Sequence, residues 1–153
     1  MPTHYRGSDN EQLALQVFIT LSRASESYQH AALERAPLPD GLTLSQFGVL
    51  EALLHLGPLP QTEVCGKLLK SKGNISVVVR HLETRGLVRR TAIEGDRRQR
   101  QLDLTDSGRE LISAYFPNLA RGFADAVGVL TPDEQRTLVS LCKKLGRGVQ
   151  QTS

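Results

Sequence analysis

Between Lys67 and Arg100 the chain concentrates side chains that can interact with a polyanion. This segment contains ten lysines and arginines but only three acidic residues, giving it a net charge of +7. The whole chain of 153 residues has a net charge of +3, so the remainder carries −4. A basic segment on an acidic body is typical of a surface that binds nucleic acid, although a solvated basic face has the same composition.

Helical spacing divides residues 71–85 into two faces. Four apolar residues fall within about 100° of one another and are expected to face the core: Ile75, Val78, Val79 and Leu82. The opposite face suits a major groove and carries Gly73, Val77, Arg80 and Thr84, flanked by Ser76 and His81. On this face Arg80 can pair with guanine O6 and N7, and Val77 can contact a thymine methyl group. An ordinary amphipathic surface helix is the alternative interpretation.

The start of this helix is a candidate phosphate site, since a helix N-terminus favours an anion. The residues expected there are Ser71, Lys72 and Asn74, with Gly73 allowing close approach to the duplex. A second candidate contact is the run of Asp96, Arg97, Arg98 and Arg100. Arginines on a narrow turn can enter a minor groove, and we expect Asp96 to orient Arg98 or Arg97 by a charge-assisted hydrogen bond. The alternative is a solvated turn with a weak local ion pair.

The elements that must position these residues follow from periodicity and from start and stop signals. We expect helices over Asn10–Arg35, from Thr43 to Gly57, over about Pro60–Leu69, and from Ser71 to Arg85. Two strands, Leu87–Ile93 and Gln99–Leu104, should form a hairpin around a turn at Glu94–Arg97. A long helix should begin at Thr105, with Pro117 kinking or breaking it, and a last helix should begin at Thr131.

This order predicts a mainly α fold with a small β-hairpin wing. Residues 42–105 form a winged helix-turn-helix DNA-binding domain, and residues 1–36 and 106–150 provide the flanking helices. The flanking helices carry apolar stripes without an obvious partner in so small a domain. We therefore expect them to be dimerisation helices that bury these stripes in a homodimer.

The residues identified above resemble those of the MarR family of winged-helix transcription regulators. The most specific part is Asp96-x-Arg98 followed, after five further residues, by Leu104-Thr105, with Gly108 beyond. The matching residues of the fourth helix and its end are Ser71, Gly73, Asn74, Ile75, Ser76, Leu82, Glu83, Gly86, Leu87 and Val88. Ser71-x-Gly73-Asn74 and Phe116-Pro117 are most similar to a branch linked to quinone and electrophile stress.

The resemblance implies a homodimer that places two recognition helices in successive major grooves of a pseudo-palindromic operator in double-stranded DNA. We expect a cytoplasmic protein, because the sequence shows no membrane helix, no apolar signal-peptide region and too few cysteines for a disulfide scaffold. It implies a repressor released by a small aromatic, phenolic or electrophilic effector. The family's effector site lies between the first, second and fifth helices. Its candidate residues here are Phe18, Leu21, Tyr28, His55, Tyr115 and Phe116. The alternative for each of them is ordinary core packing.

The two cysteines leave a redox alternative open. The peroxide-sensing branch of the family has its reactive cysteine in the first helix, and here that helix has none. Cys65 and Cys142 are interpreted as small buried hydrophobic residues, which would be unreactive as buried thiols. A thiol-based sensor using either residue is the alternative.

Other classes of protein lack their motifs in this sequence. No spacing of His, Glu, Gly or Ser matches a catalytic or metal site, so we expect neither an enzyme nor a cofactor. No apolar run approaches a membrane helix. An architectural DNA-binding protein, with a strong salt dependence but little sequence preference, remains the alternative. An RNA-binding protein is less consistent, because the basic segment has no aromatic residue for stacking.

Overall fold

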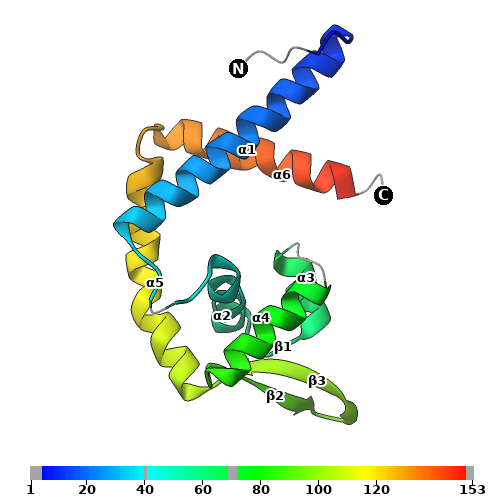
Figure 1. Cartoon of the computed structure of the whole chain (residues 1–153), viewed down its shortest axis with the longest axis vertical. Coiled ribbons are helices and arrows are strands. Elements are labelled where there is room, and N and C mark those ends of the chain that lie inside the picture. The colour runs from blue at the N-terminus through cyan, green and yellow to red at the C-terminus, as the bar shows by residue number, and fades with distance from the viewer. Residues whose placement is uncertain (1–4, 40, 69–71, 151–153) are drawn as a thin grey trace. The chain divides into compact units, whose positions relative to one another are not determined.

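The computed structural model describes residues 5–39, 41–68 and 72–150 (Figure 1). The helices are α1 (Asp9–Arg35), α2 (Leu44–Leu56), α3 (Gln61–Leu68), α4 (Lys72–Thr84), α5 (Asp106–Val127) and α6 (Pro132–Gln150). The strands are β1 (Leu59–Pro60), β2 (Val88–Ile93) and β3 (Asp96–Leu104). This arrangement confirms the expected fold class, which is mainly α with a hairpin wing.

The chain divides into two compact units. One unit contains α1, the C-terminal part of α5 from Ala120, and α6; the other spans Pro37–Leu119. The first part of α5 therefore belongs to the same unit as α2, α3, α4 and the sheet, whereas the expected domain boundary lay before this helix, at residue 105. We call the two units the helical unit and the winged unit.

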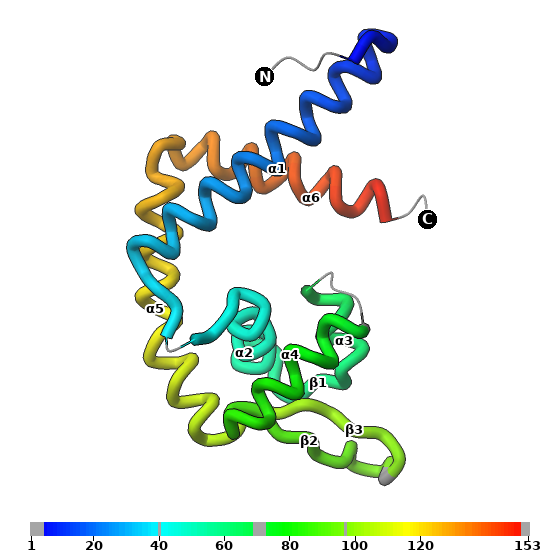
Figure 2. Tube along the Cα trace, in the orientation of Figure 1, coloured from blue at the N-terminus to red at the C-terminus, as the bar shows by residue number. Residues whose placement is uncertain are grey.

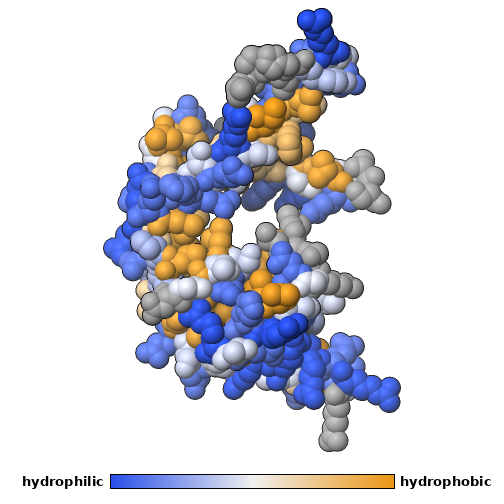
Figure 3. Space-filling view, viewed as in Figure 1, coloured by the Kyte–Doolittle hydropathy of each residue, from blue (hydrophilic) through white to orange (hydrophobic). Residues whose placement is uncertain are grey.

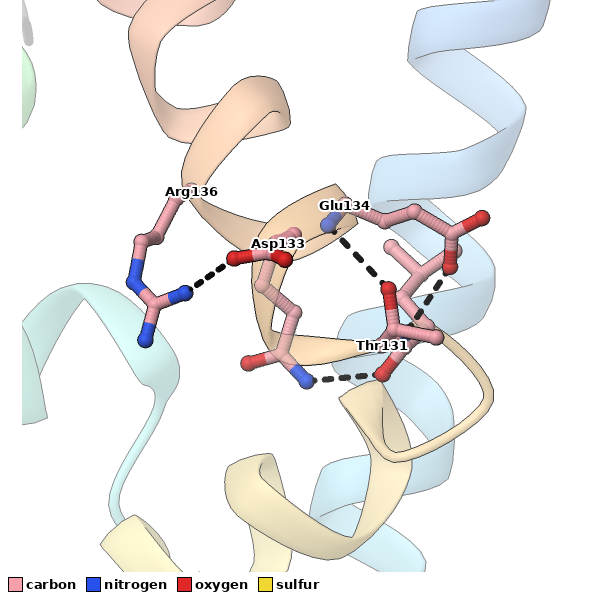
Figure 4. Close-up of polar contacts among 6 residues, drawn as sticks. Thr131, Asp133, Glu134 and Arg136 are labelled. Atoms are coloured by element: carbon pink, nitrogen blue, oxygen red, sulfur yellow. Dashed lines mark hydrogen bonds and ion pairs between the residues drawn. The ribbon is translucent and has the colours of Figure 1, made fainter.

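Three helices begin at capping residues, and those at Thr43 and Thr131 were predicted from the sequence. Ser8 and Glu11 form a reciprocal capping box at α1, and Thr43 and Gln46 form another at α2. At α6, Thr131 accepts a hydrogen bond from the Glu134 backbone N–H, and the Glu134 carboxylate accepts one from the Thr131 N–H (Figure 4). These bonds satisfy N–H groups that have no partner within the helix.

The core of the winged unit is built from the apolar faces of its helices and sheet. Its largest fully buried side chains are Val49, Leu50, Leu53, Val64, Ile75, Val79, Leu82, Leu102 and Ile112. The residues of α4 expected to face inward are all buried, since Val78 also has little exposure. Helix α4 ends at a tight turn in which Gly86, at φ 68°, donates to the Glu83 carbonyl and Leu87 donates to the Leu82 carbonyl.

The sheet has one strand more than the sequence analysis expects. Its order is β1-β3-β2, and β1 pairs antiparallel with β3 through Leu59 with Leu102 and Pro60 with Gln101. Pro60 was predicted to open the third helix, and this prediction is wrong by one residue, because α3 begins at Gln61. Beyond β1 the wing is the two-stranded β2–β3 hairpin (Figure 2).

The turn of the hairpin is tighter than predicted. Ile93 pairs with Asp96, which leaves Glu94 and Gly95 as the turn. The next pair is Ala92 with Arg100, so residues 97–99 of β3 form a bulge. The expected turn at Glu94–Arg97 is thus corrected: Asp96 and Arg97 belong to β3, and the bulge follows the turn.

Helix α5 is held to the turn that follows α4 by the residues at its start. The Thr105 hydroxyl donates to the Gly86 carbonyl over 2.6 Å and accepts from the Gly108 N–H over 3.0 Å. A Cβ atom on Gly108 would lie 2.0 Å from the Leu87 carbonyl oxygen, so only glycine fits this close approach. Pro117 does not break α5, which continues through it to Val127.

Within the helical unit, α1 and α5 make contact through aromatic side chains. The rings of Tyr28 and Phe123 meet edge to face at 5.1 Å, and the Tyr28 hydroxyl donates to the Phe123 carbonyl over 3.3 Å. Helix α6 has no buried residue, and apolar side chains are exposed on the surface of this unit (Figure 3). Among the described residues, no helix is long and apolar enough to cross a membrane.

Candidate nucleic-acid interface

Helix α4 presents the side chains that its periodicity places outward. Val77 has an exposed fraction of 46%, and Gly73, Asn74, Arg80, His81 and Thr84 are also exposed. No atom lies within 4 Å of a Cβ built on Gly73, so this position leaves space in front of the helix start. An exposed valine between Gly73 and Arg80 gives this surface an apolar element that can contact a thymine methyl group.

The expected phosphate contacts are Ser71, Lys72 and Asn74, at the start of α4. Ser71 lies outside the described residues, and for Lys72 the backbone is described as the first residue of α4 but the side chain is not. Asn74, two residues further, is exposed and has an interaction partner.

Ser76 lies at the edge of the exposed face and is half-buried. Its hydroxyl accepts a hydrogen bond of 2.8 Å from the side-chain amide of Gln61, the first residue of α3. Ser76 was predicted from the sequence at this face, whereas Gln61 was not. The two residues are 15 positions apart, and no local spacing rule pairs them.

The wing carries the other group of predicted residues. The carboxylate of Asp96 accepts a hydrogen bond of 2.9 Å from the backbone N–H of Arg98. Asp96 thus shapes the bulge by its bond to the backbone, where the sequence analysis expected a bond to an arginine side chain. The side chains of Arg98 and Arg100 are exposed, and that of Arg97 lies outside the described residues.

Ion pairs divide the basic segment into neutralised and available charges. Arg89 pairs with Asp103 at 3.0 Å, and Arg90 pairs with Glu83 at 2.9 Å. Arg80, Arg98 and Arg100 form no ion pair with any residue that the structure describes. Their charges are therefore available to a polyanion, whereas Arg89 and Arg90 are already matched.

The candidate effector residues fall into two groups. In the winged unit, the ring of Phe116 on α5 lies 4.8 Å from His55 and 6.3 Å from Phe47 on α2, and Tyr115 lies 5.6 Å from Phe47. We call Phe47, His55, Tyr115 and Phe116 the aromatic cluster. Phe47 is buried and was not predicted as part of it. Phe18, Leu21 and Tyr28 lie on α1, in the helical unit.

Burial raises the pKa of Tyr115 above its ordinary value, and it does the same for the Tyr28 hydroxyl. Both hydroxyls therefore stay protonated at neutral pH and can act as hydrogen-bond donors. For Tyr28 that donor is directed to the Phe123 carbonyl. His55 lies 3.9 Å from Glu51, one turn before it on α2.

Comparison with known proteins identifies the family. The model of the MarR family matches residues 40–99 of this chain. The HTH-type transcriptional regulator MhqR of Bacillus subtilis (strain 168) is 32% identical over 138 residues, covering 90% of this chain and 94% of MhqR. This chain belongs to the MarR family.

Solved structures of MarR-family type agree with this assignment. BpsR of Bordetella bronchiseptica, whose DNA binding is regulated by 6-hydroxynicotinic acid, is 27% identical with a TM-score of 0.76, covering 86% of this chain and 98% of BpsR. A mutant of MarR from Escherichia coli, complexed with operator DNA, has the same fold with a TM-score of 0.77 at 22% identity, covering 90% of this chain and 99% of that protein.

As a MarR-family member, the chain is a DNA-binding transcriptional regulator with a winged helix-turn-helix. Its relatives are regulators and not enzymes, which confirms the sequence-based expectation. Members of the family bind DNA operators, typically as dimers, and some respond to small molecules.

The two cysteines of this MarR-family chain differ in exposure. Cys65 on α3 is buried, as predicted. Cys142 is exposed, so the expectation that it is a buried residue is corrected. The physical reason is that α6 has no buried face within its own chain. Among the described residues, no cluster of His, Cys, Asp or Glu could hold a metal ion.

Proposed function

We propose that this chain is a sequence-specific repressor that binds a pseudo-palindromic operator in double-stranded DNA as a homodimer. The observation that carries the proposal is a set of charges that no described residue pairs with, Arg80 on α4 and Arg98 and Arg100 on the wing, whereas Arg89 and Arg90 are paired. An arginine on the exposed face of a helix can contact bases in a major groove, and arginines on a hairpin can enter the neighbouring minor groove. A repressor bound to such an operator acts where the DNA is, in the cytoplasm.

The second copy is supported by the uncovered apolar surface of the helical unit. Leu13 and Val17 on α1 have exposed fractions of 59% and 48%, and Leu141 on α6 has 59%. The further exposed members are Phe18, Leu21, Leu138, Val139, Leu145 and Val149. Obligate homodimer interfaces are apolar surfaces of this kind. We assign Phe18 and Leu21 to this interface, in preference to the effector site. Sedimentation that finds a monomer at micromolar concentration would remove the homodimer and with it the palindromic site.

We place the effector at the aromatic cluster between α2 and α5. Aromatic rings with a protonated tyrosine and a histidine suit a small aromatic molecule with a hydroxyl or carboxylate group. The regulation of BpsR by a hydroxylated heteroaromatic acid supports this class of ligand. Because α5 also contacts the end of the recognition helix through Thr105, a ligand that moves α5 can alter DNA binding. Tyr28 is assigned to holding α1 against α5.

A thiol-based release is the second candidate, and the exposure of Cys142 favours it. An exposed thiol can react with an electrophile such as a quinone, whereas the buried Cys65 cannot do so readily. If electrophile-treated protein loses operator binding and the Cys142→Ser variant keeps it, the thiol route is correct. If the parent protein and the Cys142→Ser variant lose operator binding equally, the electrophile acts at a residue other than Cys142.

The first experiment is selection of bound duplexes from a random DNA pool at two salt concentrations. The proposal expects enrichment of a two-fold-symmetric site with half-sites about one helical turn apart. Enrichment of no sequence, with binding that only weakens as salt rises, would instead identify an architectural DNA-binding protein. The protein for this selection should be reduced and free of ligand.

Arg98→Ala is expected to weaken binding to operator and to unrelated DNA by similar factors. Its charge lies on the wing and forms no ion pair with a described residue, so we expect the salt slope of binding to fall by about 1. The measurement is the dissociation constant as a function of salt on both kinds of DNA. An unchanged salt slope would show that Arg98 does not contact phosphate. Arg147→Ala, which removes the same charge from α6, is the matched control.

A further inference from the structure

The side-chain bond between Gln61 and Ser76 connects two elements of the helix-turn-helix. The Gln61 amide nitrogen donates to the Ser76 hydroxyl oxygen over 2.8 Å, and both side chains are half-buried. Gln61 opens α3, and Ser76 is the fifth residue of the recognition helix α4. The bond therefore fixes the position of a polar group on the helix that faces DNA.

The backbone of Gln61 is held by the sheet. The preceding residue, Pro60, pairs with Gln101 of strand β3, which is the central strand of the sheet and one of the two strands of the wing. Gln61 thus extends from a position anchored to the sheet and contacts α4 with its side chain. A side chain anchored at one end in this way can position its hydrogen-bond partner with little loss of entropy on binding.

The direction of the bond determines what Ser76 can do. A serine hydroxyl has one proton to donate and can accept two hydrogen bonds. Because the Gln61 amide donates, it occupies an acceptor site of the Ser76 oxygen, and the Ser76 proton stays available. Ser76 lies four residues before Arg80, so the two side chains are neighbours on α4.

We propose that Gln61 is a positioning residue of the DNA interface, which holds the Ser76 hydroxyl as a donor to a phosphate oxygen at the edge of the groove that α4 enters. This inference rests on the proposed operator binding. Thr84 and Gly73 lie at the middle of the exposed face, and helical spacing places Ser76 about 80° from Thr84 and about 60° from Gly73, at the border of that face. A residue at the border of that face is placed to reach the DNA backbone, which a neutral donor can contact without reading sequence.

The test compares Gln61→Met, Ser76→Ala and the double variant on the operator selected by the parent protein. Methionine is similar in size to glutamine and cannot donate. We expect each single change to weaken operator binding by about three- to tenfold, the value of one hydrogen bond. The double variant should bind no more weakly than Ser76→Ala alone, since Gln61 acts through Ser76. Ser76→Thr, which keeps the hydroxyl, should retain parental affinity.

Three controls separate positioning from a general effect on folding. Gln29→Met removes the same kind of bond, from a glutamine amide to the Ser25 hydroxyl on α1, and it should leave DNA binding unchanged. Each single base change in the operator should lower the affinity of every variant by the same factor as it lowers that of the parent protein, because a phosphate contact carries no base preference. The salt slope should match that of the parent, because no charge is removed.

Additive losses in the double variant would overturn the proposal, as would an altered base preference or an unchanged affinity in Gln61→Met. A loss in Ser76→Thr as large as that in Ser76→Ala would also overturn it. Thermal unfolding of each variant identifies a loss that comes from misfolding, in which case Gln61→Leu replaces Gln61→Met. The unsubstituted protein is measured first. If it selects no operator, the result contradicts the proposed function and not the role of Gln61.

Discussion

Arg80→Ala is expected to lower operator affinity by about 1–3 kcal/mol and to relax the preference at one base position of each half-site. Arg80 lies on the exposed face of α4 and forms no ion pair with a described residue. Its guanidinium can therefore make two parallel hydrogen bonds to guanine O6 and N7. The apolar residues on the opposite face are buried, so the substitution should not disturb the fold.

The measurement is a repeated selection from the random DNA pool, followed by dissociation constants for the operator and its single-base variants. Arg147→Ala is the matched control, because Arg147 is an exposed arginine on α6 in the helical unit. Arg80→Ala should alter the selected motif at one position, whereas Arg98→Ala should keep the motif and bind more weakly. Equal losses on every sequence for both variants would contradict this division of roles.

Gly108→Ala is expected to lower the free energy of unfolding of the winged unit by about 1–3 kcal/mol, as overpacking does. The added Cβ would lie 2.0 Å from the Leu87 carbonyl oxygen and 2.9 Å from its carbonyl carbon. These are backbone atoms, which cannot move aside as a flexible side chain would. The same turn holds the Thr105 hydroxyl bond to Gly86, so we expect operator affinity to fall together with stability.

Thermal and urea unfolding measure this loss, and Ser107→Ala is its control. Ser107 is the exposed neighbour of Gly108 in the first turn of α5, so its replacement tests whether any change in that turn has the same effect. A stable Gly108→Ala variant with parental operator affinity would show that α5 can move away from Leu87 at little cost. The coupling of α5 to the recognition helix would then be looser than the contacts suggest.

Local features of the chain could be predicted from sequence because the physics that produces them is local. The capping boxes at Thr43 and Thr131 each involve residues three positions apart, so the start of each helix is encoded within one turn. The two faces of α4 were predicted for the same reason. Buried Ile75 and Leu82 and exposed Val77 follow from a period of 3.6 residues.

Features that join distant segments were missed. Strand β1 has two residues, too few for a pattern, and exists because Leu59 and Pro60 pair with residues more than 40 positions away. The bulge in β3 is set by the pairing of Ala92 with Arg100. The bond from Gln61 to Ser76 likewise depends on how α3 packs against α4.

The sequence by itself determined the helices, the inward face of α4, the basic segment and the family resemblance. The tertiary structure decided which charges in that segment are available, since Arg89 and Arg90 are matched by Asp103 and Glu83 from other elements. It also decided that Cys142 is exposed and that Phe47 joins Phe116. The physical reason is that periodicity and capping act over a few residues, whereas ion pairing, burial and ring contacts depend on residues brought together only when the chain folds.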